Sequence, residues 1–204
     1  MTRIITISRQ FGSGGREVGT RLAEELGFTY YDREIISKLS DGQGTGKNSF
    51  SMSLDAGMLP PYPLTYGRTF ANFAAYPQYN SALLIAQQNT ITQLAQKGDC
   101  VFVGRCADSI LKDFNPLKLF VYADMPSRVE RCRGREKDGE HFSNRELQRR
   151  IRQIDANRKR LHDMFSDGRW GKKENYDLML NTTGIEIKKL IPPLKEYALA
   201  YFRE

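Results

Sequence analysis

A glycine cluster near the start of the chain has the composition and the position of a phosphate-binding loop. Residues 12–15 read Gly-Ser-Gly-Gly, three residues after an apolar run at 4–8 and one residue before a helical pattern that starts at 17. Glycines let successive backbone N–H groups turn toward one point, and the amino end of a helix adds partial positive charge there. Arg9 and Arg16 flank the cluster and would face the same anion. We expect phosphate binding; the alternative is a tight turn that needs glycine for its geometry alone.

The elements around this loop are predicted to form a parallel sheet with helices between its strands. Short apolar, β-branched runs indicate strands buried on both faces, and apolar residues three and four apart indicate helices. A strand, a helix and a second strand in succession favour a right-handed crossover between parallel strands. The expected strands lie at 4–8, 28–31, 100–103, 117–123 and 177–180, and the expected helices at 17–26, 33–39, 81–97, 145–160 and 185–201, the last kinked or split by Pro192 and Pro193.

Polar and charged side chains stand where the expected strands end. Ligands of open parallel sheets bind beyond the carboxyl ends of the strands, so these side chains are candidates for a binding site. They are Arg9, Asp32, Arg105, Asp124 and Asn181.

The stretch 128–160 is rich in arginine and is predicted to form two basic helices joined by a loop. Leu147, Ile151 and Ile154 stand at helical spacing in its second half, and the sequence Asp-Gly-Glu-His at 138–141 separates the two halves. Arginine stays charged and can bind phosphate through two parallel hydrogen bonds, so this pair of helices suits a lid over phosphates. The alternative is a solvated face whose arginines pair with glutamates at helical spacing.

The stretch 40–80 shows neither helical nor strand periodicity. It holds four prolines and several glycines and aromatic residues. It is too long for an ordinary loop and too aromatic for plain disorder, so we expect a mobile lobe or an ordered insertion. The sequence at 42–47 looks like the end of a phosphate loop, but Asp41 and Asn48 stand where that motif needs a glycine and a hydroxyl residue.

The overall composition fits a single soluble domain that spans residues 1–204, with 40% hydrophobic residues and a net charge of +7. That charge suits a polyanionic ligand such as nucleotide phosphates, nucleic acid or an acidic membrane surface. Three scattered cysteines indicate reduced thiols in a cytoplasmic protein, and two histidines argue against a histidine-rich zinc site. A strand begins within three residues of the first methionine, so we expect no signal peptide, and no apolar run approaches the roughly 20 residues that span a bilayer.

The chain resembles the cytidylate kinase-like branch of the nucleoside monophosphate kinases. The resemblance covers most of the chain, and its most specific strings are Ser-Arg-Gln-Phe-Gly-Ser-Gly-Gly-Arg-Glu at 8–17 and Gly-Arg-Cys-Ala-Asp at 104–108. Weaker matches continue at 22–32, 120–131 and 176–183.

The resemblance implies a five-stranded parallel P-loop kinase core, with an acceptor-binding insertion at 40–80 and an arginine-rich lid at 128–160. It implies transfer of the γ-phosphoryl group of ATP to a nucleoside monophosphate, CMP or dCMP, with Mg²⁺. By this resemblance Gly12, Ser13, Gly14, Gly15, Arg16 and Glu17 hold the donor phosphates, with Glu17 as the metal ligand. The acceptor is expected to face Asp32, Arg33, Lys38, Arg105 and Asp155. Asp155 would also anchor Arg158 or help to place Mg²⁺. Arg131, Arg135 and Arg158 bracket the transferring group, and together with Arg16 on the donor phosphates they are the expected catalytic residues.

The loop departs from the pattern of active family kinases. Laid without gaps from Ile5 to Asp32, the comparison puts Gly15 at the place of the phosphate-loop lysine and Glu17 at the place of a hydroxyl residue. Either Arg16 substitutes for the lysine, or the loop binds phosphate without a cation on it. Three alternatives to a CMP kinase therefore remain: a nucleotide-binding protein with little or no phosphoryl transfer, a kinase of another small phosphate acceptor, and a nucleic-acid binder. The sequence contains no recognised nucleic-acid-binding motif, which argues against the last of these.

Overall fold

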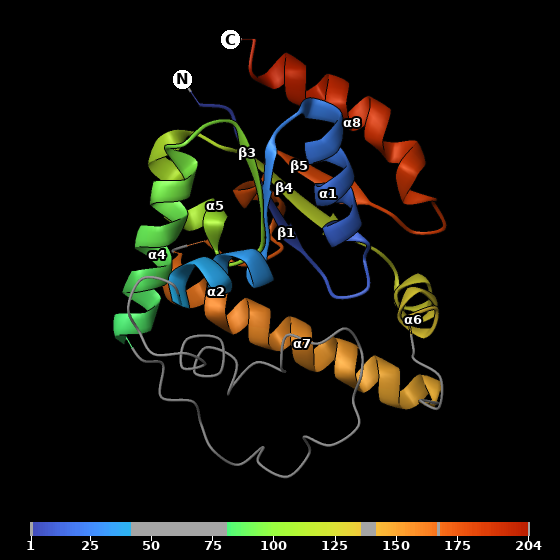
Figure 1. Ribbon diagram of the computed structural model, residues 1–204. Helices are drawn as coiled ribbons and strands as arrows, with labels where there is room; N and C mark the ends of the chain where they lie inside the picture. Colours follow the sequence, from blue (N-terminus) through green and yellow to red (C-terminus); the bar gives the residue numbers. More distant parts are fainter. Residues whose placement is uncertain (1, 42–80, 136–141, 167, 204) are drawn as a thin grey trace.

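The computed structural model describes residues 2–41, 81–135, 142–166 and 168–203, and in it five strands form one parallel sheet (Figure 1). The strand order is β2-β3-β1-β4-β5, and every neighbouring pair is parallel. The predicted α/β fold with a five-stranded parallel sheet is therefore confirmed. The strands are β1 (Ile4–Arg9), β2 (Thr29–Tyr31), β3 (Cys100–Val103), β4 (Leu117–Tyr122) and β5 (Leu178–Asn181).

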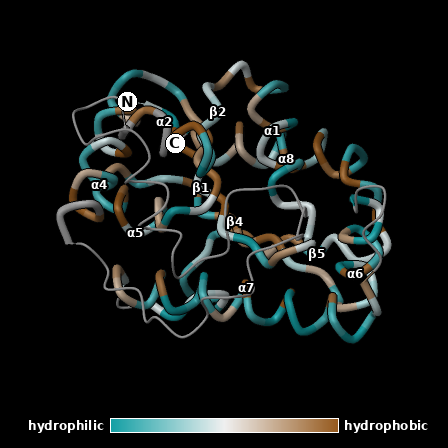
Figure 2. Tube along the Cα trace, turned by 60° about the horizontal axis from the view of Figure 1, so that its bottom comes forward, coloured by the Kyte–Doolittle hydropathy of each residue, from teal (hydrophilic) through white to brown (hydrophobic). Residues whose placement is uncertain are grey.

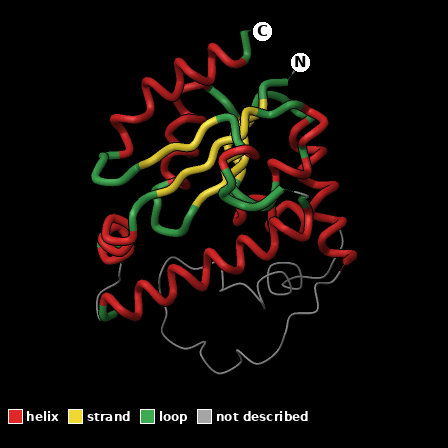
Figure 3. Tube along the Cα trace, turned by 180° about the vertical axis from the view of Figure 1, so that it is seen from behind, coloured by secondary structure: helices red, strands yellow, loops and turns green. Residues whose placement is uncertain are grey.

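Helices cover both faces of the sheet (Figures 1 and 3). The helices α1 and α8 lie together on one face, whereas α4 and α5 lie on the other, with α2 against α4. The long helix α7 passes beneath the loop that follows β1 and contacts α5 and α6. The helices are α1 (Gly15–Leu26), α2 (Arg33–Asp41), α4 (Ser81–Ala95), α5 (Ala107–Ile110), α6 (Met125–Arg133), α7 (Asn144–Phe165) and α8 (Ile187–Tyr201).

Alternate side chains of β1 enter two separate apolar cores. Ile5 and Ile7 pack with α1 and α8, whereas Ile4 packs with residues of α2, α4 and α5. The close approach of α1 to the sheet needs a glycine, because a side-chain carbon on Gly19 would lie 2.4 Å from Val103 Cγ2. The packing on both faces therefore fixes the start of α1 directly above the end of β1.

The last helix is not split at its two prolines. Helix α8 runs unbroken through Pro192 and Pro193, so of the two predicted outcomes, a kink or a split, the split is wrong and the kink stays a prediction. Proline removes a backbone donor and costs a helix hydrogen bond. Here the buried side chains of Ile191 and Leu194 pack against the core that α8 shares with α1, and this apolar burial offsets the lost bonds.

The predicted pair of basic helices is present as α6 and α7. Val129 and Cys132 of α6 meet Leu147 and Ile151 of α7 in a small apolar core. Most residues along α7 are hydrophilic, as the colours in Figure 2 show. The predicted loop at 138–141 and almost all of the stretch 40–80 lie outside the described residues, so the lid and the insertion stay predictions.

Within the described parts of the chain, no helix combines the length and the apolar character that crossing a membrane requires.

Candidate phosphate-binding site

The chain turns from β1 into α1 through a loop whose glycines adopt conformations that other residues rarely adopt. Gly12 has φ 78° and Gly14 has φ 81°, both in the left-handed region. A side-chain carbon on Gly12 would lie 2.8 Å from the Arg128 carbonyl oxygen, so there is also no room for one. Inside the loop the Ser13 hydroxyl donates to the Gln10 carbonyl at 2.9 Å. The shape of the loop therefore depends on glycine.

The start of α1 presents backbone N–H groups to this loop. The first hydrogen bond within the helix runs from the Val18 N–H to the Gly14 carbonyl at 3.0 Å. The N–H groups of Gly15, Arg16 and Glu17 lie ahead of the helix's own hydrogen bonds and are available to a ligand. Such groups, together with the helix dipole, attract an anion. This is the backbone geometry that a phosphate cradle needs.

A buried ion pair between α6 and α7 holds the loop at Phe11. Arg128 Nε donates to the Phe11 carbonyl at 2.6 Å, and Asp155 accepts the Phe11 N–H at 2.7 Å. Arg128 and Asp155 also pair with each other, with side chains 6% and 14% exposed. Burial raises the pKa of Asp155, although the Phe11 N–H and the Arg128 charge act in the opposite direction. The Phe11 peptide is thus held from both sides.

A second brace reaches the loop from the end of β5. The buried Thr182 hydroxyl donates to the Ser13 carbonyl at 2.7 Å. Arg131 Nη2 donates to the Thr182 carbonyl at 2.5 Å and to the Ile185 carbonyl at 3.2 Å, so Arg131 fixes the turn that carries Thr182. The brace therefore brings Arg131, predicted to act on the transferring group, to the border of the loop.

The Arg9 side chain crosses the end of the sheet from β1 toward β3. Its Cβ lies 2.7 Å from where a side-chain carbon on Gly15 would be, and its Nη1 lies 2.2 Å from the same position on Gly104. Arg158 Nη1 donates to the Arg9 carbonyl at 3.0 Å, and the Arg158 guanidinium lies over the Phe11 ring. Burial, and next the charge of Arg158, lower the pKa of Arg9 to about 9. Two arginines therefore meet beside the loop.

Arg16 points toward the end of β2 and is paired there. It lies 2.6 Å from Asp32 and 3.0 Å from Glu34. Partial burial lowers the pKa of Arg16, but the two carboxylates outweigh it and raise the pKa above its ordinary value. Asp32 is buried and also accepts the N–H groups of Glu34 and Ile35, at 3.0 and 3.1 Å, so it caps α2. The predicted donor role of Arg16 and acceptor role of Asp32 stay predictions.

Three successive residues after β3 have left-handed backbone conformations. They are Gly104 (φ 80°), Arg105 (φ 59°) and Cys106 (φ 56°). Such conformations cost a non-glycine residue about 1–3 kcal/mol and cluster at ligand sites. Arg105 is buried there, next to the position reached by Arg9. This strain fits the predicted contact between Arg105 and an acceptor phosphate, which no observation tests.

The remaining predicted residues lie on helix α2 and just after helix α6. Arg33 and Lys38 lie on α2, and Arg135 is exposed two residues after α6 ends. Within the described residues, Arg135 makes no hydrogen bond or ion pair with the loop. The roles assigned to these three residues stay predictions.

Carboxylates near the loop are already paired with arginines. Glu17 lies 2.9 Å from Arg21 and is directed along α1, and Asp32 and Asp155 are paired as described above. In the described ranges, no group of three His, Cys, Asp or Glu side chains is arranged to hold a metal ion. The described residues therefore do not fit an Mg²⁺ ion held by the protein itself, and Glu17 as a metal ligand stays a prediction.

Sequence reasoning assigned no role to two residues that shape the site, Arg128 and Thr182. Arg128 is one of many arginines in a basic stretch, and Thr182 lies near the end of a weak family match, at 176–183. Their contacts with the loop join positions 117 and 169 residues apart. No spacing rule connects positions so distant, so only the position of Thr182 at a strand end could have drawn attention to it.

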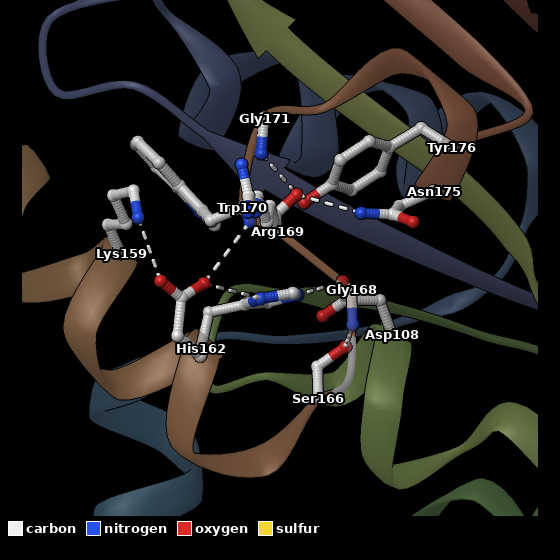
Figure 4. Close-up of polar contacts among 11 residues, drawn as sticks. Asp108, Lys159, His162, Ser166, Gly168, Arg169, Trp170, Gly171, Asn175 and Tyr176 are labelled. Carbon is white, nitrogen blue, oxygen red and sulfur yellow. Dashed lines mark hydrogen bonds and ion pairs between the residues drawn. The ribbon is translucent and has the colours of Figure 1, made fainter.

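A cavity of about 660 Å³ lies between α4, α5 and the end of α7, away from the glycine loop. Its wall includes the buried side chains of His162 and Asp108, whose Nε2 and Oδ2 atoms lie 2.8 Å apart (Figure 4). His162 Nδ1 faces the Asp163 carboxylate at 3.9 Å. Burial, and next the Asp108 charge, raise the pKa of Tyr176 beside them. In the described part of the chain, the cavity is lined by no residue of the glycine loop, so this cluster is a separate feature that ties α7 to α5.

Comparison with known proteins identifies the family. The model of the cytidylate kinase-like family matches residues 4–184. The chain belongs to the cytidylate kinase-like family. No curated protein matches this family member.

Solved structures share the fold of this cytidylate kinase-like protein. An uncharacterized protein from Eubacterium ventriosum ATCC 27560 is 23% identical with a TM-score of 0.70, over 96% of this chain and 98% of its own. The shikimate kinase from Bacteroides thetaiotaomicron is 12% identical with a TM-score of 0.57, over 97% and 98%. The shikimate kinase from Acinetobacter baumannii, in complex with shikimate, is 13% identical with a TM-score of 0.55, over 100% and 96%. At these identities the likeness shows the fold, and family and fold together support a kinase-like function on a nucleotide or another small molecule.

Proposed function

We propose that this protein transfers the γ-phosphoryl group of ATP to a nucleoside monophosphate, with CMP and dCMP as the first acceptors to test. The observation that carries the proposal is the glycine loop between β1 and α1, braced from α6, α7 and β5 at the carboxyl end of the sheet. Such a loop fits the phosphates of a donor nucleotide. The cytidylate kinase-like family supports a nucleotide as the acceptor.

The chain contributes positioning and charge to this reaction. An oxygen of the acceptor phosphate forms a bond to the γ-phosphorus while the bond to the β–γ bridging oxygen breaks, so ATP and CMP become ADP and CDP. The braces on Phe11 and Ser13 keep the loop N–H groups in place without reorganisation, which is the condition for electrostatic stabilisation. Mg²⁺ enters as part of the substrate, bound to the ATP phosphates.

A panel of acceptors tests the proposal. The protein is incubated with MgATP and each common nucleoside monophosphate, and ADP is measured. We expect acceptor-dependent ADP with CMP or dCMP. Gly12→Ala should lower turnover at least about tenfold, because it puts a side-chain carbon of the loop 2.8 Å from the Arg128 carbonyl oxygen of α6 and so displaces the loop. Gly27→Ala is the matched control, since Gly27 also has positive φ (68°) but ends α1 in open space. No acceptor-dependent ADP in the panel would contradict the proposal.

A nucleotide-binding protein with little or no transfer is the second candidate. Gly15 at the lysine position and the engagement of Arg16 by two carboxylates favour it. Measurable ATP binding without ADP from any acceptor would support this candidate over the kinase. Shikimate and simple sugars belong in the same panel, because the structural neighbours include shikimate kinases and a sugar kinase. ADP formed with one of these, but with no nucleotide, would indicate a kinase of another small acceptor.

A further inference from the structure

We propose that Arg9 supplies the positive charge that a phosphate-loop lysine supplies in related kinases; this inference rests on the proposed function. Gly15 stands at the lysine position and carries no side chain. The space that a side chain on Gly15 would fill is taken by Arg9, whose Cβ and Cδ lie 2.7 and 3.2 Å from the first carbon of such a side chain. The loop has thus lost a cation at one residue, and a neighbouring residue brings one to the same place.

Two glycines leave room for the whole Arg9 side chain. From Gly15 it continues to Gly104, where its Nη1 and Cζ lie 2.2 and 3.3 Å from the position of a side-chain carbon. Any residue larger than glycine at either position would displace it. The guanidinium therefore lies between the phosphate loop and the end of β3. Arg105, the residue predicted to contact the acceptor phosphate, follows directly after Gly104, so the Arg9 guanidinium lies between the loop and that residue.

The Arg9 guanidinium forms no ion pair with a carboxylate among the described residues. It makes no hydrogen bond or ion pair there, whereas Arg16 pairs with two carboxylates and Arg128 with one. Burial, and next the neighbouring Arg158, lower the pKa of Arg9 by more than Tyr30 and Asp32 raise it, so the structure disfavours its charge in the absence of an anion. A bound phosphate would remove this cost. The charge of Arg9 therefore opposes stability in the free protein and favours binding.

This reasoning predicts opposite effects of one substitution with and without an anion. Arg9→Met keeps an apolar stem on Gly15 and removes the charge. Without an anion, Arg9→Met should unfold at a higher temperature than the wild type, because it removes a partly buried, uncompensated cation. With tripolyphosphate, the wild type should gain stability by binding, and Arg9→Met should gain much less.

Thermal unfolding with and without tripolyphosphate, and with ATP in the absence of metal, tests the inference. We expect tripolyphosphate to bind Arg9→Met at least about tenfold more weakly than the wild type, which corresponds to about 1.4 kcal/mol. Arg3→Met is the matched control, because Arg3 lies just before the same strand, at its other end, where it is 44% exposed and paired with Asp99 at 2.5 Å. Without tripolyphosphate, Arg3→Met should unfold at a temperature no higher than that of the wild type. Its unfolding temperature should rise with tripolyphosphate as much as that of the wild type does.

A swap of the two positions gives a second test. Arg9→Gly should lose affinity for tripolyphosphate, and adding Gly15→Lys to it should restore at least part of that affinity, because the lysine enters space that Arg9 has left. A folded double variant without recovery, or an Arg9→Met protein with wild-type affinity, would overturn the inference. A wild type that binds neither tripolyphosphate nor ATP would overturn the proposed function itself, and with it the role of Arg9.

Discussion

Asp155 is the residue whose loss should damage both the fold and the candidate site. Its carboxylate accepts the Phe11 N–H at 2.7 Å and pairs with Arg128, which is 6% exposed. Asp155→Ala leaves Arg128 buried without its counter-ion. Breaking a buried ion pair in this way costs about 3–5 kcal/mol. Because the Asp155 side chain is 14% exposed, water can partly replace it, and we expect a loss of about 3 kcal/mol.

The measurement is differential scanning calorimetry of the protein without ligand. In a domain of this size, 1 kcal/mol shifts Tm by about 2–4 °C, so Asp155→Ala should unfold about 6–12 °C below the wild type. Glu25→Ala is the matched control, since it removes an exposed carboxylate 3.3 Å from Lys195. An exposed pair of this kind contributes less than about 1 kcal/mol. Equal melting temperatures for the two variants would refute the reasoning.

Two further variants separate the fold from the site. Asp155→Asn keeps an oxygen for the Phe11 N–H and removes the charge, so its stability should fall between the wild type and Asp155→Ala. Arg128→Met combined with Asp155→Leu replaces the pair by apolar side chains and should recover stability to within about 1–2 kcal/mol. ATP binding should not recover, because Phe11 then lacks both of its partners. A double variant that binds ATP as the wild type does would show that the braces do not shape the loop.

Further predictions concern other parts of the molecule. His162→Phe should lower the free energy of unfolding in urea by about 2–3 kcal/mol, because it leaves the buried Asp108 without its partner at 2.8 Å. Lys159→Ala removes an exposed ion pair and should cost under about 1 kcal/mol. Equal losses for the two variants would contradict this reasoning. The Ser143 hydroxyl and N–H lower the pKa of Glu146 below its ordinary 4.5, so the cap of α7 is intact above that value and is lost as the pH falls through the lower folded pKa. Hydrogen exchange of the first α7 amides, followed from about pH 5 to about pH 3, should show this loss in the wild type and not in Glu146→Gln. All three cysteines are buried, so a thiol reagent should label the native protein only as fast as it opens, and immediate labelling would be the contrary result.

The strands and the glycine loop could be predicted because their signals are local. The run at 4–8 alternates between two buried faces, and the structure extends it only to Arg9. The glycine cluster begins at Gly12, soon after this strand ends, and Gly12 and Gly14 have the left-handed conformations that a tight turn around an anion requires. Apolar spacing predicted α4 to within two residues, from 81–97 to Ser81–Ala95. In each case neighbouring residues carry the information.

The sequence alone does not indicate which arginine, Arg9 or Arg16, is the better candidate to replace the charge of the phosphate-loop lysine. Both arginines flank the glycine cluster, and composition treats them alike. Their environments differ because the fold places the end of β2, with Asp32, beside Arg16, and places the bare backbone of Gly104 beneath Arg9. These neighbours become visible only when the strand order is known. The continuity of α8 through its prolines likewise depends on the burial of its apolar side chains, and helix propensity alone does not predict that burial.

The braces on the glycine loop also determine when the site can form. Phe11 is held by residues 117 and 144 positions later, and Ser13 by a residue 169 positions later. Contacts of such long range close only after most of the chain has been ordered, and they slow folding. During synthesis the glycine segment is therefore made well before the residues that hold it, and it is among the last parts to take its shape. A nascent chain that stops before Thr182 contains the glycine segment but cannot yet hold it in the form of a phosphate cradle.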